Sequence, residues 1–449
     1  MMRARLGRVI TTLIAIGAVL AALIAWLNLR GEDAVTGAEP DLAAPELIAR
    51  GAYLARAGNC MGCHTERGGV AYAGGRGVPT PFGTVVAPNL TPDAEHGLGR
   101  WSAAEFWRAL HNGRSRDGRL LYPAFPYPNY TRVTRADSDA LFAYLRSLPP
   151  SNRANDAHTL RFPFDRQVAL AVWRALYFRP AQPENDTSRS AEWNRGAYLV
   201  EGLGHCNACH ASRNALGATT SPLDLAGGLI PVQNWYAPSL ASKLEAGVAD
   251  WSDAHVVALL KTGVSARGAV MGPMGEVVSG STQHLNDADL RAMAVYLKAL
   301  PPPPEEAAKL AALAASAAAA ASAASAASAA SSSASTAASS TAGAKLYDRH
   351  CAACHGDQGE GVPGTYPALA ASRAVTIPMP ANLVHIVLEG GFPPATADNP
   401  RPYGMPPFAT VLSNDEVAQL LTHIRGSWGN EAGAVSAFDV TKYRASGGR

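Results

Sequence analysis

The strongest constraint in this sequence is a five-residue motif, Cys-x-x-Cys-His, that occurs three times. Its copies occupy residues 60–64, 206–210 and 351–355, and together they use all six cysteines of the chain. Whatever chemistry the motif performs must therefore account for all the cysteine in the protein. Three evenly spaced copies in 449 residues also indicate about three domains and not one large core.

Several kinds of site could use this motif. A zinc ribbon needs four ligands per metal, usually from two neighbouring Cys pairs, whereas these pairs lie far apart in the sequence. No β-α-β pattern frames any copy as a thioredoxin-like site would require, and disulfides within such short loops would cross-link almost nothing. Cys-x-x-Cys-His is the attachment motif of c-type haem, in which both cysteines form thioethers and the histidine binds the iron. We therefore predict three covalently bound haem c groups.

The predicted site residues follow directly from the motif. The attachment cysteines are Cys60, Cys63, Cys206, Cys209, Cys351 and Cys354, and the proximal iron ligands are His64, His210 and His355.

The N-terminus has the features of an export signal. Arg3, Arg5 and Arg8 precede a segment, from Val9 to Leu27, that contains no charged residue. This segment is long enough to cross a bilayer, and its preceding arginines should stay in the cytoplasm. We predict that residues 1–30 form a transmembrane anchor that holds the chain on the periplasmic side of a bacterial inner membrane. The alternative is a signal peptide that is cleaved after Ala38.

Residues 45–150 and 193–301 repeat each other beyond the cysteines. Segments 50–54 and 195–199 both read Arg-Gly-Ala-Tyr-Leu, segments 87–90 and 237–240 read Ala-Pro-Asn-Leu and Ala-Pro-Ser-Leu, and Trp-Ser occurs at 101–102 and 251–252. Each copy predicts a short amphipathic helix with a glycine twelve residues after the tryptophan, at Gly113 or Gly263. Each also predicts a terminal helix that begins near Thr134 or Asn286 and stops at Leu-Pro-Pro. Residues 343–430 predict a shorter unit whose last helix begins after Ser413. The expected fold is mainly α, with three consecutive small domains.

The connecting segments differ in composition. Residues 151–192 contain many large apolar side chains, so we expect an ordered helical segment packed between the first two domains. Residues 302–342 are rich in alanine and serine, which predicts a solvated tether that lets the third domain move. Residues 431–449 are expected to form a C-terminal tail.

A haem iron that transfers electrons usually takes a second axial ligand, most often methionine. Met405 stands in a Gly-Met-Pro-Pro loop after the third motif, and Met274 stands in Gly-Pro-Met-Gly after the second. We predict both as distal ligands, with Met379 and Met271 as the alternatives. The competing explanation for any methionine is core packing, and it fits Met293 best because that residue follows the period of a helix.

The first domain has no methionine at the corresponding position. Phe125 occupies it, and Met61 lies inside the attachment loop on the wrong side of the iron. His111 is our first choice as distal ligand and His96 is the other nearby nitrogen donor. An open coordination position remains the alternative.

The composition excludes some functions. The formal charge is only +2, and no run of basic residues is interleaved with aromatics, so nucleic acid is not an expected partner. No glycine-rich dinucleotide motif follows a predicted strand, and no Gly-x-Ser-x-Gly elbow is present in the sequence. We expect no catalytic site on this chain itself.

The motifs together resemble a known family. They include Arg-Gly-Ala-Tyr-Leu before the first two haem motifs, Leu-Tyr-Pro-Ala-Phe-Pro-Tyr at 121–127, Gly-Pro-Met-Gly-Glu-Val-Val at 272–278 and Met-Pro-Pro-Phe at 405–408. With them the chain resembles the membrane-associated three-haem cytochrome c subunits of bacterial periplasmic dehydrogenases, of the alcohol, gluconate, aldehyde or nicotinate dehydrogenase type. The resemblance implies three cytochrome c-like domains and supports Met274 and Met405 as distal ligands. Many relatives have methionine where this chain has Phe125, so the resemblance does not identify the distal ligand of the first haem.

The resemblance also implies a function. Such a subunit relays electrons from a dehydrogenase catalytic subunit, which can be a molybdenum hydroxylase, a quinoprotein or a flavoprotein, to ubiquinone or to a cytochrome or oxidase acceptor. Phe125 weakly favours the molybdenum class. The alternatives are a haem peroxidase that uses an open iron in the first domain, and a cytochrome subunit of a terminal oxidase.

Overall fold

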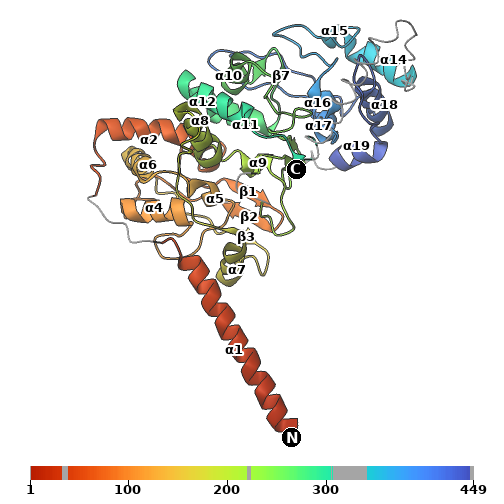
Figure 1. Ribbon diagram of the computed structural model, residues 1–449. Helices are drawn as coiled ribbons and strands as arrows, with labels where there is room; N and C mark the ends of the chain where they lie inside the picture. Colours follow the sequence, from red (N-terminus) through yellow and green to blue (C-terminus); the bar gives the residue numbers. More distant parts are fainter. Residues whose placement is uncertain (1, 33–38, 220–223, 305, 307–340, 445–449) are drawn as a thin grey trace. The chain divides into compact units, whose positions relative to one another are not determined.

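The computed structural model describes residues 2–32, 39–219, 224–304, 306 and 341–444 (Figure 1). The described chain is mainly helical and divides into two compact units. Unit 1 contains residues 1–186, 198–205 and 214–218, and unit 2 contains residues 187–197, 206–213 and 219–449. Most of the predicted tether lies outside the described residues, as does the alternative cleavage site at Ala38.

Unit 1 contains the N-terminal helix and the first haem motif. Its elements are α1 (Met2–Leu29), α2 (Pro45–Ala57), α3 (Cys60–Cys63), β1 (Gly77–Thr80), β2 (Gly83–Val86), α4 (Ala103–Asn112), α5 (Tyr127–Tyr130), α6 (Arg135–Ser147), β3 (Thr159–Leu160), α7 (Gln167–Tyr177) and the π-helix η1 (Tyr198–Leu203). The three strands form one small antiparallel sheet in the order β1-β2-β3.

Unit 2 contains the second and third motifs. Its elements are α8 (Ala191–Ala197), α9 (Asn207–His210), β4 (Gly228–Leu229), β5 (Tyr236–Ala237), α10 (Asp253–Thr262), β6 (Val264–Ser265), β7 (Gly268–Ala269), α11 (Pro273–Gly280), the 3-10 helix η2 (Thr282–His284), α12 (Asp287–Lys298), α14 (Thr341–His350), α15 (Ala352–His355), α16 (Arg373–Thr376), α17 (Ala381–Glu389), α18 (Asn414–Arg425) and α19 (Ala437–Arg444). Its described strands form two-stranded antiparallel ladders, β4-β5 and β6-β7.

The predicted helix boundaries are confirmed. Helices α6, α12 and α18 begin directly after Thr134, Asn286 and Ser413, whose side chains accept a hydrogen bond from the backbone N–H three residues on. Helices α4 and α10 end at glycines in the left-handed region, with φ of 59° at Gly113 and 75° at Gly263. These signals are local, so they can be read without knowledge of the tertiary structure.

A pair of packed helices recurs around each motif. The helix before the motif packs against the terminal helix, giving the pairs α2–α6, α8–α12 and α14–α18. A Cβ at Gly51 would lie 1.8 Å from the Ala140 carbonyl oxygen, and one at Gly196 would lie 2.0 Å from that of Ala292. At Gly343 the corresponding distance, to the Gln419 oxygen, is 2.4 Å. Only glycine permits backbones to approach this closely, so a glycine allows the same close contact in all three helix pairs.

Alanine at Gly51 should destabilise unit 1. The added methyl would overlap the backbone of α6, and such overpacking costs about 1–3 kcal/mol or more in the free energy of unfolding. Thermal unfolding of Gly51→Ala, followed by circular dichroism, should show a lowered transition. Gly433→Ala is the control, because no atom lies within 4 Å of its Cβ position. Equal stability of the two variants would contradict the close crossing.

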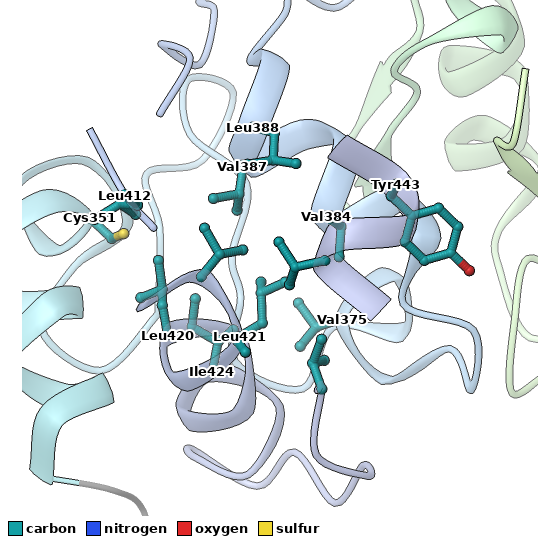
Figure 2. Packing of buried hydrophobic residues seen from close by; sticks show 14 of the residues in the cluster. Cys351, Val375, Val384, Val387, Leu388, Leu412, Leu420, Leu421, Ile424 and Tyr443 are labelled. Atoms are coloured by element: carbon teal, nitrogen blue, oxygen red, sulfur yellow. The ribbon is translucent and has the colours of Figure 1, made fainter. Parts of the chain in front are cut away.

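The core around the third motif joins three helices. Figure 2 shows Leu420, Leu421 and Ile424 of α18 gathered with Val384 and Val387 of α17. Helix α19 lies in the segment predicted as a tail, yet Val440 and Tyr443 belong to this buried cluster. The compact region around the third motif thus extends beyond residue 430.

Residues around the second and third motifs also contact each other within unit 2. Arg373 forms an ion pair with Asp250 at 2.6 Å and donates to the Gly247 carbonyl oxygen at 2.8 Å. The Asn382 side chain exchanges hydrogen bonds of 2.8 and 2.7 Å with the backbone of Tyr236. These contacts join residues that lie on the two sides of the predicted tether. Movement of the third domain stays a prediction, because most of the tether lies outside the described residues.

Helix α1 is the one described helix long and apolar enough to cross a bilayer. Its apolar stretch runs from Arg5 to Leu29 with a mean hydropathy of 2.5.

The segment 151–192 contains a helix, α7, as expected. However, Val168, Val172 and Leu176 of α7 are exposed, as is Phe162 before it. The apolar composition of this segment therefore correctly predicted a helix, but it did not predict that several of its apolar side chains are exposed.

Candidate haem-attachment sites

Each Cys-x-x-Cys-His motif folds into a single helical turn. The backbone N–H of the histidine donates to the carbonyl oxygen of the first cysteine at 3.0 Å for His64, 2.9 Å for His210 and 2.9 Å for His355. Residues three and four apart on a helix lie on the same face, so this turn brings the two sulfur atoms and the imidazole together. That is the arrangement needed to attach one porphyrin through two thioethers and to bind its iron from below.

The imidazoles are oriented in the same way at all three motifs. Nδ1 of His64, His210 and His355 lies 2.8, 2.7 and 2.9 Å from the carbonyl oxygens of Pro88, Pro238 and Pro367. A carbonyl oxygen can only accept, so Nδ1 must carry the proton. Nε2 then keeps its lone pair for a metal, and the ring orientation is fixed. The chemistry of the donor set therefore fits an axial iron ligand.

The protonation of these rings also suits metal binding. Burial lowers the pKa of His64, His210 and His355, although the hydrogen bond to the proline carbonyl opposes this. The neutral form is the one that can bind a metal through Nε2.

The three proline carbonyls are functional groups that sequence reasoning missed. A signal existed for two of them, because Pro88 and Pro238 occupy equivalent positions in the repeated segments 87–90 and 237–240. The repeat was recognised as evidence of duplication, but nothing in it reveals that its carbonyl faces a histidine. Pro367 lies much closer to its motif, so no common spacing would have identified it.

The thiols do not have the properties of a redox-active pair. Burial, followed by the neighbouring cysteine, raises the pKa of Cys60 and Cys206 to about 12 and that of Cys351 to about 11. Catalytic dithiols instead have a lowered thiol pKa. Among the described residues no group of three or more His, Cys, Asp or Glu side chains is placed to hold a metal ion. The raised pKa of these thiols therefore does not support a thioredoxin-like redox site.

Aromatic side chains surround the first motif. Tyr130 is buried, and its pKa is raised well above the ordinary value by burial and by the thiols of Cys60 and Cys63. Phe125 packs against Tyr130 with ring centroids 5.4 Å apart. The loop at 121–127 thus lies near the first attachment site, as the comparison with the second domain predicted, with an aromatic ring in place of a thioether.

The two histidines predicted for the first iron differ in environment. His111, near the end of α4, is 5% exposed, stacks on Trp107 with centroids 4.4 Å apart, and its Nδ1 has no hydrogen-bond partner among the described residues. Burial lowers its pKa, although a hydrogen bond with the Thr131 backbone opposes the shift. His96 lies in a turn that is capped by Asp93. A buried ring is the better candidate, so His111 stays the prediction.

The predicted distal methionines stand in constrained loops. Met405 exchanges backbone hydrogen bonds of 2.7 and 2.9 Å with Gly391. Met274 is the second residue of α11 and follows Pro273; the residue before the helix, Gly272, has a φ of 59°. Met271 packs on Gly391, where a Cβ would lie 3.4 Å from its methyl group. Met379 and Met405 both pack against the buried cluster around the third motif. Met293 is buried, which confirms its prediction as a core residue.

Comparison with known proteins supports the same interpretation. A sequence model of the cytochrome c family matches residues 48–149 and 340–428. The cytochrome c subunit of the quinone-dependent alcohol dehydrogenase of Gluconacetobacter polyoxogenes is 39% identical over 415 residues, which cover 89% of this chain and 85% of that protein. The chain belongs to the family of cytochrome c subunits of bacterial dehydrogenases.

Two further relatives have the same kind of name. The gluconate 2-dehydrogenase cytochrome c subunit of Pantoea cypripedii is 36% identical over 419 residues, covering 90% of this chain and 91% of the relative. The fructose dehydrogenase cytochrome subunit of Gluconobacter japonicus is 34% identical over 433 residues, covering 95% and 88%. In this cytochrome c subunit the family model includes the first and third motifs. The second motif lies outside both matched ranges.

Proposed function

We propose that this cytochrome c subunit holds three haem c groups and relays electrons from a dehydrogenase catalytic subunit to ubiquinone or to another respiratory acceptor. The observation that carries the proposal is the repeated geometry of the motif. All three copies form one helical turn, and all three histidines are held by a proline carbonyl. Residues 193–301 have this geometry as well as the glycine crossing at Gly196, so we count them as a cytochrome c domain beside 45–150 and 343–430.

The roles of the side chains follow from the sites. Haem iron, when bound, supplies a one-electron redox couple. The six cysteines would attach the groups covalently, which prevents their loss from an exported protein, and His64, His210 and His355 would bind the irons. Met274 and Met405 would close the second axial position at the second and third sites. His111 is the candidate at the first site, where an open position is the alternative.

The cellular setting is part of the proposal. Helix α1 would anchor the subunit in the inner membrane with its body in the periplasm, since arginines at 3, 5 and 8 precede the apolar stretch. The partner would be a molybdenum hydroxylase, a quinoprotein or a flavoprotein, and it would oxidise a small organic substrate. The named relatives are dehydrogenase subunits, so they do not favour a peroxidase or a terminal-oxidase subunit.

The proposal is tested on the native complex. The full chain, tagged at its C-terminus, should be purified from membranes together with a large dehydrogenase subunit. Anaerobic addition of that subunit's substrate should then reduce the cytochrome, as seen in the α-band of its visible spectrum. Co-purification of a copper-haem oxidase, or turnover of peroxide by the isolated chain, would contradict it.

A further inference from the structure

Helix α7 presents an apolar face to solvent within unit 1. Val168, Val172 and Leu176 are 76%, 39% and 56% exposed, and their four-residue spacing places them on one side of the helix. The buried residues of the helix are Leu170, Arg174 and Ala175. An apolar stripe of this kind on a folded surface marks a contact with another protein or with a membrane.

The position of α7 distinguishes between these two partners. The Asn28 side chain donates to the Ala171 carbonyl oxygen at 2.9 Å, and the Arg174 guanidinium donates to the Asn28 side-chain oxygen at 2.9 Å. Asn28 lies in the last turn of α1, directly after the uncharged segment that ends at Leu27. Figure 1 shows α7 beside this C-terminal end of α1. The apolar face of α7 is therefore located where the apolar span ends.

Further contacts make the junction between α1 and the body of unit 1 rigid. Arg114 donates to the Asn28 carbonyl oxygen at 3.1 Å and forms an ion pair with Glu32, and the Asn112 side chain donates to the Gly31 carbonyl oxygen at 2.9 Å. These bonds satisfy carbonyl groups that the end of a helix leaves without partners. Arg174 is itself buried, and its guanidinium lies against the rings of Tyr127 and Phe178, at 5.1 and 4.7 Å from their centroids. Helix α7 consequently cannot change its depth independently of α1.

The charges around α7 favour lipid as the partner. Arg161, Arg166 and Arg179 are exposed around the helix. Asp165 is the one acidic residue between positions 161 and 179, and it pairs with Arg166 at 3.3 Å, which leaves Arg161 and Arg179 as the net positive charges. Arginines attract anionic phosphate headgroups, and aromatic residues such as the exposed Trp26 are typical of the membrane interface. A helix with an apolar face and basic flanks lies in the interface plane with its apolar side about 5–10 Å deep in the headgroup and acyl boundary.

We propose that α7 is an interfacial helix that inserts Val168, Val172 and Leu176 into the outer leaflet and holds unit 1 against the bilayer. The inference rests on the proposed anchoring of the chain by α1. It goes further, because a single span would by itself leave the body free to tilt. With two contacts, the first attachment site has a fixed orientation toward the membrane surface.

Hydrophobic photolabelling tests the proposal on the full chain with its haems. The protein is reconstituted in vesicles of phosphatidylethanolamine and phosphatidylglycerol that contain a lipid-soluble carbene precursor, and labelled peptides are identified by mass spectrometry. We expect label at residues 168, 172 and 176 to the extent found along α1. The exposed apolar residue Val70 of the same unit is the internal control and should stay unlabelled.

A triple variant completes the experiment. V168S, V172S and L176S together should lose the label on α7 but keep it on α1, whereas Val70→Ser should leave the pattern unchanged. Label on α1 without label on α7 would overturn the interfacial helix and leave the anchor intact. Absence of label from both helices would refute the anchor, and the interfacial helix with it. Label on α7 that vanishes when the catalytic subunit is bound would assign this face to that protein instead.

Discussion

Replacing Cys206 and Cys209 with alanine should reduce the number of haems per chain from three to two. Each thioether requires its own cysteine, and the two remaining pairs, 60–63 and 351–354, use all the other sulfhydryls. Haem that survives extraction with acidified organic solvent, measured as pyridine haemochrome per chain, gives the count directly. Reduction of the acceptor by the dehydrogenase substrate should be lost in the same variant.

The second site is the informative one because the family model does not reach it. Its assignment depends on geometry, namely the helical turn of 206–210 and the hydrogen bond of His210 to Pro238. The matched controls are the corresponding double variants at 60–63 and at 351–354, each of which should also lose one haem. Circular dichroism and recovery of the catalytic subunit should show that the variants are folded. The second site would be ruled out if the wild-type chain carried only two haems and the variant without Cys206 and Cys209 still carried the same two.

Features encoded by a few neighbouring residues could be predicted from the sequence. A capping side chain at Thr134, Asn286 or Ser413 acts on the backbone three residues away, and a glycine at 113 or 263 ends a helix by its own φ. The haem motif is local for the same reason, since both sulfurs and the imidazole belong to one turn. Such signals are independent of how the rest of the chain folds.

Features that depend on distant residues could not be predicted in this way. The acceptor for each histidine lies 24, 28 or 12 residues further along the chain, so its identity depends on the path of a loop. The apolar residues at 168, 172 and 176 indicated a packed helix, but only the structure reveals that they are exposed beside the end of α1. The ion pair of Arg373 with Asp250 also escapes sequence reasoning, because it depends on which surfaces meet.

The two haems with predicted methionine ligands should each respond to a single leucine substitution. Leucine nearly conserves the volume of methionine, so Met274→Leu and Met405→Leu should fold, but each removes one sulfur ligand. Thioether ligation raises the potential of a haem iron. Each variant should therefore show a lowered midpoint potential for one haem, by a substantial part of the roughly 0.8 V range over which axial ligands set potentials. The part of the sulfur-to-iron charge-transfer absorbance that comes from this haem should also disappear in the variant.

Met271→Leu and Met379→Leu are the matched controls, because both residues lie in the same loops or core as the predicted ligands. Met271 lies against Gly391, and Met379 packs on the same buried cluster as Met405. If Met274 and Met405 are the ligands, replacing Met271 or Met379 should leave both potentials and the absorbance unchanged. If Met271→Leu lowered a potential while Met274→Leu did not, the ligand of the second haem would be reassigned. The same reasoning applies to Met379 and Met405 at the third haem. Whichever methionines prove to be the ligands, the haem of the first motif should be insensitive to all four substitutions, because Phe125 stands there in place of a methionine.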